Sequence, residues 1–412
     1  MPLELPAHGR PWPELRDEMA AMRGNDLDWK HGRHGAYVWY ASDELEDVLR
    51  EAFGMFLVEN GLGMRAFPSI ARMENETLAM VRSLLHGDDE TAGIFTSGGT
   101  ESIFLGVLAM REWARHERPG IVRPEIVAPH SAHPALNKAA HLQGLTVRRV
   151  PVGPDFRADP AALEAAVNQN TIGMYASAPT YSLGMVDPIE ALGPIAERRG
   201  LWLHVDACVG GILSPFVRDS GYAVPAFDFA IPGVSSISAD LHKSGFAAKP
   251  ASTVSFRTRE LREFARYTFD DWPSGVYSSL TFTGTRPGGA IAAAWAAMNF
   301  LGQEGYREIA AASMRAKQKT IDGLAAIEGV KVHGAPPLYA FSWAASGVDM
   351  GAVAGAMARR GFMCGQTTSP AGIHFMATPV HEAAADAYAA AAAESIAEAR
   401  AGGAVGKAAA YN

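Results

Sequence analysis

Cysteine is scarce in this 412-residue chain, which contains only Cys208 and Cys364. Two thiols cannot form a framework of several disulfide bonds or a zinc site with four cysteine ligands, so the fold must depend on its hydrophobic core. Apolar residues make up 48% of the chain and charged residues 19%, proportions typical of a soluble globular protein with two or three domains. This composition excludes a disordered tail, a collagen-like fibre and a mini-protein held together by disulfides.

Long apolar runs and an excess of positive charge are lacking as well. The longest candidate for a membrane span, residues 288–301, is mostly alanine and glycine and is too short to cross a bilayer. No basic segment followed by an apolar run opens the sequence, so we expect no signal peptide and a cytoplasmic protein without membrane insertion. With 36 basic and 44 acidic residues, the formal net charge of −8 gives no general attraction to nucleic acid.

Short apolar segments alternate with helical patterns through much of the chain. We expect strands at 93–95, 125–128, 146–150, 171–176 and 201–205, with helices at 101–115, 134–143, 159–167 and 188–199 between them. This alternation predicts βαβ units and a mostly parallel sheet, whose ligand would lie beyond the carboxyl ends of the strands. Two more helices are expected at 42–60 and 69–85, while residues 1–40 are rich in loop-forming patterns.

The last part of the chain predicts a second, smaller unit. A long alanine-rich helix is expected after Arg286-Pro287-Gly288-Gly289, with a break at Gly302 or Gly305. A looser alternation of helices and strands follows it and indicates a smaller α+β C-terminal domain. The expected division is an N-terminal segment that joins the small domain (1–50), a large cofactor-binding domain (51–300) and the C-terminal small domain (301–412).

A lysine and an aspartate each stand in a polar cluster at the end of an apolar segment. A lone lysine is usually a surface residue, but Lys243 is followed by small or apolar residues, where burial would lower its pKa and make the amine a nucleophile for an aldehyde. Asp206 ends an apolar run, where it could cap a helix or keep a heterocyclic nitrogen protonated. The 37 residues between Asp206 and Lys243 leave room for one more strand, so both can face one crevice.

Two further motifs join a strand to a helix. The run Thr96-Ser97-Gly98-Gly99-Thr100-Glu101-Ser102 offers hydroxyls, glycines and helix N-terminal N–H groups that suit an anion, although a plain tight turn has the same composition. His133 stands at a second junction, where it could cap the helix or stack on a planar ring. An anion cradle, a stacking ring, an acid and a lysine together describe a site for pyridoxal phosphate. No metal site is expected.

These motifs resemble those of the fold-type-I pyridoxal-phosphate enzymes of the group II decarboxylase superfamily and, within it, the sphingosine-1-phosphate lyases. The resemblance covers residues 35–400. It rests on the segments 96–103, 124–129, 204–211, 227–229, 236–243, 271–273, 286–289 and 373–375. It implies the aspartate aminotransferase fold, an α/β fold in which helices flank a mostly parallel seven-stranded sheet and a smaller α+β C-terminal domain follows.

The resemblance also implies a role for each site residue. Lys243 would bind pyridoxal phosphate covalently, Asp206 would bind its pyridine nitrogen, and His133 would stack on its ring. The remaining contacts would come from Ser97, Gly98, Gly99, Thr100 and His242 around the phosphate, Cys208 beneath the ring and Thr180 near the phenolic oxygen. Members of the family are dimeric, so Tyr277 and Gly288 would reach the cofactor of the partner subunit in a homodimer.

The bond that breaks stays open between three hypotheses. A lyase that cleaves the Cα–Cβ bond of a β-hydroxy amine or amino acid needs a base at the hydroxyl, for which Tyr37, Tyr40, Lys249 and a water are candidates. Tyr40 is also expected to bind the substrate. An amino-acid α-decarboxylase is the alternative, because Arg65 could grip the carboxylate of a substrate, although it could equally be an exposed loop residue. The third hypothesis is a protein that holds pyridoxal phosphate without catalysis.

Overall fold

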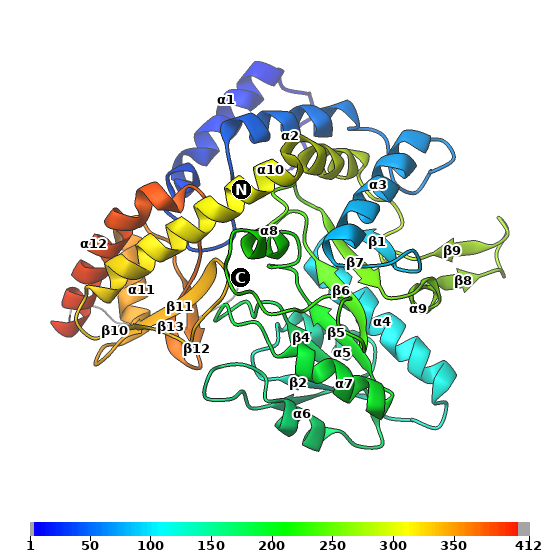
Figure 1. The fold of residues 1–412 in the computed structure, drawn as a ribbon. Helices are drawn as coiled ribbons and strands as arrows, with labels where there is room; N and C mark the ends of the chain where they lie inside the picture. Colours follow the sequence, from blue (N-terminus) through cyan, green and yellow to red (C-terminus); the bar gives the residue numbers. More distant parts are fainter. Residues whose placement is uncertain (1–3, 403–412) are drawn as a thin grey trace.

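A seven-stranded sheet forms the centre of the larger part of the molecule (Figure 1). The computed structural model describes residues 4–402. In the order β1-β7-β6-β5-β4-β2-β3, the neighbouring strands pair in parallel except β7, which is antiparallel to both β1 and β6. The strands are β1 (Ala92–Thr96), β2 (Glu125–Pro129), β3 (Thr146–Val150), β4 (Thr171–Ser177), β5 (Trp202–Asp206), β6 (Val234–Ala239) and β7 (Ser252–Phe256). The predicted mostly parallel seven-stranded sheet is confirmed.

Burial on both faces explains why most of these strands could be predicted. All seven residues of β4 and all five of β5 are buried, because helices cover both sides of the sheet, and such strands read as continuous apolar runs. The strand β7 was missed because its serine-rich sequence resembles a loop. The helices around the sheet are α3 (Pro68–Leu84), α4 (Gly99–Glu117), α5 (Ala135–Leu142), α6 (Pro160–Ala166), α7 (Ile189–Arg199), α8 (Ser214–Asp219) and α9 (Arg259–Glu263).

The first forty residues differ from the predicted loop-rich segment. They include an α-helix, α1 (Trp12–Met22), none of whose residues is buried. Because it buries no face, α1 has no apolar stripe by which it could be recognised in the sequence. The next helix, α2 (Asp43–Met55), begins at Ser42, whose hydroxyl accepts a hydrogen bond from the N–H of Leu45.

The long helix α10 (Gly288–Ala325) runs from the larger to the smaller part of the molecule (Figure 1). Its helical geometry breaks at Gly302, where φ is 55° and ψ is −171°. Glycine adopts this conformation without the strain that a side chain would add, so the predicted break lies at Gly302 rather than at Gly305. The expected domain limits at residues 50 and 300 stay a prediction, and residues 1–3 and 403–412 of those domains lie outside the described range.

A four-stranded antiparallel sheet, in the order β10-β11-β13-β12, forms the smaller C-terminal part. Its elements are β10 (Val330–Val332), β11 (Ala340–Ala345), α11 (Met350–Arg359), β12 (Gly365–Thr368), β13 (Ala371–Met376) and α12 (His381–Arg400). The two helices pack against each other, and α12 also contacts α10. Within residues 4–402, no helix is long and apolar enough to cross a membrane.

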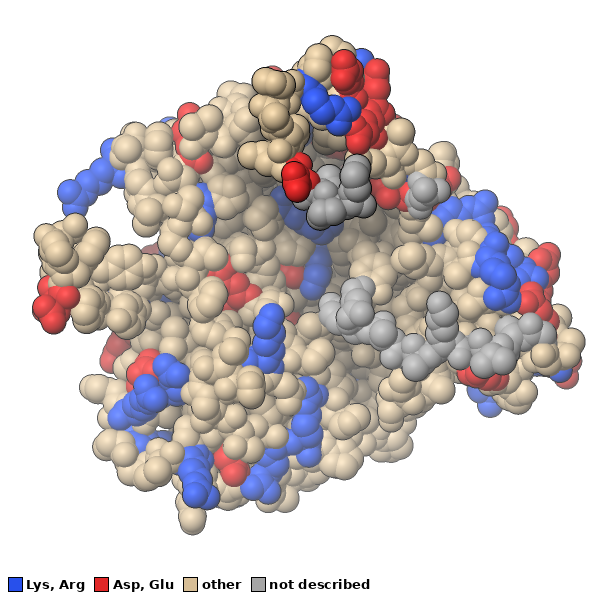
Figure 2. All heavy atoms as spheres, turned by 180° about the vertical axis from the view of Figure 1, so that it is seen from behind, with Lys and Arg blue, Asp and Glu red and all other residues tan. Residues whose placement is uncertain are grey.

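A short hairpin of β8 (Tyr267–Phe269) and β9 (Tyr277–Ser279) projects from the side of the larger part (Figure 1). Its strands are short and largely exposed, because few other parts of the same chain pack against the hairpin. On the face seen from behind, basic and acidic side chains both occur across the surface, with uncharged residues between them (Figure 2).

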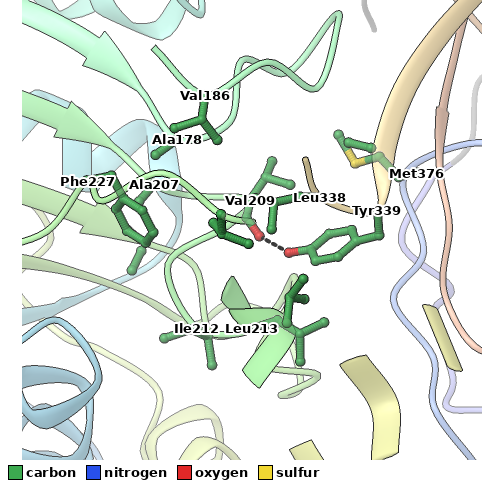
Figure 3. Close-up of a cluster of buried hydrophobic side chains, with 14 of the residues drawn as sticks. Ala178, Val186, Ala207, Val209, Ile212, Leu213, Phe227, Leu338, Tyr339 and Met376 are labelled. Atoms are coloured by element: carbon green, nitrogen blue, oxygen red, sulfur yellow. Dashed lines mark hydrogen bonds between the residues drawn. The ribbon is translucent and has the colours of Figure 1, made fainter. Parts of the chain in front are cut away.

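A buried apolar cluster joins the smaller part to the ends of the large sheet (Figure 3). Its members include Ala178, Val186, Ala207, Val209, Ile212, Leu213, Phe227, Leu338, Tyr339 and Met376. In the middle of this cluster, the hydroxyl of Tyr339 donates a hydrogen bond of 2.5 Å to the carbonyl oxygen of Val209. This contact fixes the segment after β5, which carries the residues of the cavity described next.

Candidate active site

A cavity of about 350 Å³ lies beyond the carboxyl ends of β5 and β6, beside the first turn of α4. This is the position expected for the ligand of such a sheet. Among the predicted site residues, the cavity is lined by Ser97, Gly98, Gly99, Thr100, His133, Asp206, Cys208, His242 and Lys243. Residues that the sequence did not single out also line it, namely Glu101, Ile103, Pro179, Tyr181, Val209 and Asp240.

The amine of Lys243 forms an ion pair with a buried carboxylate. Its Nζ lies 2.8 Å from Oδ2 of Asp240, which is three residues earlier in the turn after β6. Burial alone would lower the pKa of Lys243, but the negative charge of Asp240 outweighs it, and the pKa lies well above its usual value. The predicted lowering of the pKa of Lys243 is therefore wrong for the chain without its cofactor, because the sequence did not reveal the paired carboxylate.

The carboxylate of Asp206 stands at the end of β5 with donors on both oxygens. The hydroxyl of Tyr175 donates to Oδ2 at 2.6 Å, and the backbone N–H of Cys208 donates to Oδ1 at 3.0 Å. Burial, followed by the charge of Asp206, raises the pKa of Tyr175 well above its usual value, so the phenol keeps its proton and donates it. An ionised carboxylate held in this way can keep a heterocyclic nitrogen protonated.

The glycine-containing turn between β1 and α4 approaches the base of the cavity closely. A Cβ atom on Gly99 would lie 2.8 Å from Sγ of Cys208 and 3.0 Å from both carboxylate oxygens of Asp240, so no side chain fits there. The turn is held by Glu101, whose Oε2 accepts hydrogen bonds from the N–H and the hydroxyl of Ser97, at 2.7 and 2.6 Å. The N-terminal N–H groups of the nineteen-residue α4 thus stand beside the cavity, where they suit a phosphate.

Two histidines face the cavity from different loops. His133 accepts a hydrogen bond at Nδ1 from the N–H of Ala135, and burial lowers its pKa, so its ring is neutral at pH 7. The guanidinium of Arg149 shapes the loop before it, because it donates to the carbonyl oxygens of His130 and Ala132 at 2.9 and 2.7 Å. His242 lies near the glycine turn, with its pKa lowered by burial as well.

Tyr181, an aromatic residue that the sequence did not single out, forms part of the cavity wall. The ring of Tyr181 packs edge-on to that of His133, with 5.8 Å between the centroids, and lies 4.5 Å from the ring of His374 on β13. Tyr181 follows the strand β4 by a few residues, which was the one available signal, since side chains beyond strand ends line such cavities. Thr180, predicted near the phenolic oxygen, accepts a hydrogen bond from the N–H of Met185 and is absent from the cavity lining, and its role towards the cofactor stays a prediction.

Three candidates for the hydroxyl base lie together near a neighbouring groove. Lys249 and Tyr40 both line this groove of about 240 Å³, and Nζ of Lys249 donates to the carbonyl oxygen of Tyr37 at 3.4 Å. Although Lys249 remains in contact with solvent, the surrounding protein lowers its pKa, and the positive charge of Lys243 lowers it further. Lys249 and Lys243 therefore act on each other electrostatically.

Three further predicted residues do not line the cavity of their own chain. Arg65 is exposed in the segment before α3. Tyr277 lies in the projecting hairpin, and Gly288 begins α10, where its backbone closely approaches that of Glu59. Their expected roles towards a substrate or a partner subunit stay predictions.

With this geometry in view, comparison with known proteins identifies the family. The model of the pyridoxal-dependent decarboxylase conserved domain matches residues 2–332. The chain belongs to this family. It is 38% identical over 384 residues to a sphingosine-1-phosphate lyase of Arabidopsis thaliana, which covers 91% of this chain and 70% of that protein. It is also 35% identical over 313 residues to a probable L-aspartate decarboxylase of Pyrococcus furiosus, covering 76% of this chain and 82% of that protein.

Solved structures agree with this assignment. The structure of a sphingosine-1-phosphate lyase of Burkholderia pseudomallei matches with a TM-score of 0.93 and 37% identity, over 98% of this chain and 94% of that one. A glutamate decarboxylase of Lactobacillus brevis has a TM-score of 0.81 at 18% identity, over 97% of this chain and 96% of that one, which shows a shared fold. The predicted fold is thereby confirmed, and the chain is a pyridoxal-phosphate-dependent lyase of this family.

The cavity fits this cofactor. A single cavity brings together an amine for the aldehyde, a carboxylate for the ring nitrogen, a neutral imidazole and a helix N-terminus for the phosphate. The space that a Cβ on Gly99 would fill is kept open next to Cys208 and Asp240.

Proposed function

We propose that this enzyme cleaves the Cα–Cβ bond of a β-hydroxy amine or amino acid in a retro-aldol reaction and releases an aldehyde. The observation that carries the proposal is the place of Lys249, which lines the neighbouring groove together with Tyr40 and donates a hydrogen bond to the carbonyl oxygen of Tyr37. A retro-aldol cleavage needs a base for the β-hydroxyl proton, whereas a decarboxylation does not. The pKa of Lys249 is lowered by the surrounding protein and by Lys243, which increases the fraction of neutral amine able to accept that proton.

The other residues would hold the cofactor in place for this reaction. Pyridoxal phosphate, when bound, withdraws electrons from the carbon that bears the amine and so weakens a bond to it. Asp206, held by Tyr175, would keep the ring nitrogen protonated. The turn at Ser97, Gly98, Gly99 and Thr100 would bind the phosphate with His242, and His133 would stack on the ring. Lys243 would bind the cofactor and then hold a proton near the reacting carbon.

The atoms of the cleavage balance without a further reactant. The base takes the proton of the β-hydroxyl, the Cα–Cβ bond breaks, and Cβ leaves as an aldehyde. The electron pair that stays at Cα takes up a proton, for which the amine of Lys243 is the donor in reach of the cavity. The products are an aldehyde and an amine shorter by the departing carbons.

The products decide between this proposal and its alternative. The holoenzyme is incubated with a panel of β-hydroxy amines, with and without a phosphate ester, and with α-amino acids, while aldehyde, amine and CO₂ are measured. We expect aldehyde in equal amount to the substrate consumed, and no reaction of a matched amine that lacks the β-hydroxyl. Amine and CO₂ without aldehyde would overturn the lyase and establish the α-decarboxylase.

One observation favours the decarboxylase as the second candidate. The chain is 35% identical to a probable L-aspartate decarboxylase, as well as to lyases. Arg65 was the expected grip for a substrate carboxylate, but it is exposed and does not line the cavity of its own chain. If Arg65 has this role, Arg65→Ala raises KM for anionic substrates alone, and an unchanged KM removes Arg65 from the substrate site.

We also propose that the enzyme acts as a homodimer. The projecting hairpin and the segment after it expose a group of apolar side chains, namely Tyr267, Phe269, Trp272, Val276, Tyr277 and Phe282. A second copy that covered them would also bring Tyr277 and Gly288 towards a partner's cavity. Light scattering should give twice the mass of one chain, and Trp272→Asp should weaken the dimer, whereas a monomeric wild-type enzyme would contradict the proposal.

A further inference from the structure

Three buried hydroxyl groups lead to the carboxylate that pairs with Lys243. The hydroxyl oxygens of Thr96 and Ser102 are 2.6 Å apart, and those of Ser102 and Ser252 are 2.8 Å apart. The hydroxyl of Ser252 then donates to Oδ1 of Asp240 at 2.5 Å. We call Thr96, Ser102 and Ser252 the hydroxyl chain. All three residues have no solvent exposure, and Asp240 is 1% exposed.

The direction of these hydrogen bonds follows from the carboxylate at their end. Asp240 only accepts, so Ser252 gives its proton to Asp240 and accepts from Ser102, which in turn accepts from Thr96. Three hydroxyl dipoles therefore point the same way and stabilise negative charge on Asp240. Hydrogen bonds in such a series strengthen one another, and the buried carboxylate can stay ionised.

The two oxygens of Asp240 thus have separate partners. Oδ1 accepts from Ser252, while Oδ2 lies 2.8 Å from Nζ of Lys243 and 3.7 Å from Nε2 of His242. Because Ser252 holds Oδ1 of Asp240, Oδ2 stays directed towards the amine of Lys243. A freely rotating carboxylate in the same place would pair with the amine less often.

The hydroxyl chain also connects Lys243 with the turn between β1 and α4, where the phosphate would bind. Thr96 ends β1 directly before the turn, Ser102 lies in the first turns of α4, and Ser252 begins β7 opposite Thr96 in the sheet. The three residues of the hydroxyl chain therefore join β1, α4 and β7 next to the cavity.

We propose that Asp240, oriented by the hydroxyl chain, is a positioning residue that keeps the amine of Lys243 charged and directed into the cavity. Once released from the cofactor, the ammonium of Lys243 would be the proton donor for the reacting carbon. This inference rests on the proposed role of Lys243.

Other charged and titratable groups around Lys243 have to be taken into account. They are Asp206, Cys208, His133 and Tyr339 from other segments, and His242 and Lys249 from the same turn between β6 and β7. Among them only Asp206 carries a carboxyl group, and both of its oxygens already accept hydrogen bonds, from Tyr175 and from the backbone of Cys208. Asp240 is therefore the carboxylate whose removal should change the charge state of Lys243 most.

The test is a pH titration of the visible absorption band of the holoenzyme, which reports the protonation of the link between Lys243 and the cofactor. Removing an opposite charge at this distance should lower the midpoint by about 1–3 pH units in Asp240→Asn. The matched control is Asp228→Asn, because Asp228 is equally buried and pairs with His86 outside the cavity. Its midpoint should equal that of the wild type.

Two further variants keep the test decisive if Asp240→Asn does not fold. Ser252→Ala leaves the carboxylate but removes its anchor, so the midpoint should fall by less than in Asp240→Asn, and Asp240→Glu should restore part of the shift. A folded Asp240→Asn or Ser252→Ala variant with the wild-type midpoint would overturn the proposal. The role of Lys243 is tested separately, since Lys243→Ala must lose the band; if it does not, the proposed function itself fails.

Discussion

The phenol of Tyr175 donates its hydrogen bond of 2.6 Å to Asp206 from the neighbouring strand of the sheet. Tyr175 lies in the interior of β4, and Asp206 ends β5, so the phenol reaches the carboxylate diagonally across two paired strands. Both residues are buried, and Asp206 also lines the cavity. Because strand pairing fixes the distance between the two side chains, the sheet itself sets the position of the Asp206 carboxylate in the cavity.

Tyr175→Phe removes this donor and little else. We expect the free energy of unfolding to fall by about 1.5–3 kcal/mol, the usual contribution of a hydrogen bond to a charged group, and pyridoxal phosphate to bind more weakly. Denaturant unfolding and cofactor titration measure the two effects. The control is Tyr388→Phe, which removes the buried phenol that accepts a hydrogen bond from Trp343 in the smaller part and should reduce stability without changing cofactor affinity. Equal affinities in both variants would contradict a role for Tyr175 at Asp206.

The two lysines near the cavity should separate cofactor binding from cleavage. Lys243→Ala should lose both the visible band and all measurable turnover, because the covalent link disappears. Lys249→Ala should keep the band and lower kcat by about 10²–10⁴-fold, the usual effect of removing a general base. Absorption spectra and initial rates on a β-hydroxy amine check this. Full activity of Lys249→Ala would transfer the role of base to Tyr37, Tyr40 or water.

A buried ion pair under the start of α10 should matter for stability. Arg286 lies 2.7 Å from Oε1 of Glu74 and donates to the carbonyl oxygen of Gly61 at 3.0 Å. Arg286→Met leaves Glu74 buried without its partner and should cost about 3–5 kcal/mol in denaturant unfolding. Adding Glu74→Gln should restore part of that loss. The exposed pair of Arg72 and Glu76 is the control, since Arg72→Ala should cost less than about 1 kcal/mol.

His204 should make the protein sensitive to acid. Its nitrogens lie 2.8 and 3.1 Å from the hydroxyls of Ser236 and Ser238, and burial lowers its pKa to about 4 from the usual 6.5. Between these values the unfolded chain binds a proton that the folded chain does not, so stability falls as the pH is lowered from 6.5 to 4. The loss amounts to about 3 kcal/mol for this one group.

The pH dependence of His204→Gln isolates this effect. The slope of unfolding free energy against pH should be shallower in His204→Gln than in the wild type, while His31→Gln, which changes an exposed histidine, should keep the wild-type slope. Comparing slopes between variants is needed, because burial raises the pKa of Asp187 to about 6 and this group acts in the opposite direction in the same range. Parallel curves for all three proteins would show that His204 does not titrate on unfolding.

The sequence predicted those parts of the fold that follow from local patterns. Continuous apolar runs marked the buried parallel strands. A break in α10 was predicted at Gly302 or Gly305, and it lies at Gly302, where the combination of φ 55° and ψ −171° suits a residue without a side chain. It did not predict the place of β7 between β1 and β6, since strand order depends on contacts far apart in the chain. The helix α1 escaped because it buries no apolar face.

The candidate site, like the fold, could be predicted only where local motifs define it. Lys243, Asp206 and His133 could be chosen from their motifs, and the structure brings them to one cavity. The partners of these residues, Tyr175 and Asp240, could not be chosen, because each acts through a contact across strands or within a turn. For that reason the sign of the pKa change at Lys243 was also predicted wrongly.

The place of β1 in the sheet has a consequence for synthesis on the ribosome. As an edge strand, β1 pairs with β7 alone, which is the last strand of the large sheet to be translated, and Thr96 lies opposite Ser252. Until residue 256 has emerged, the hydrogen-bonding groups of β1 have no partner in the sheet and can pair with other nascent chains. The pocket for the cofactor is therefore completed late in translation, and a chain that stops before β7 should need a chaperone to remain soluble.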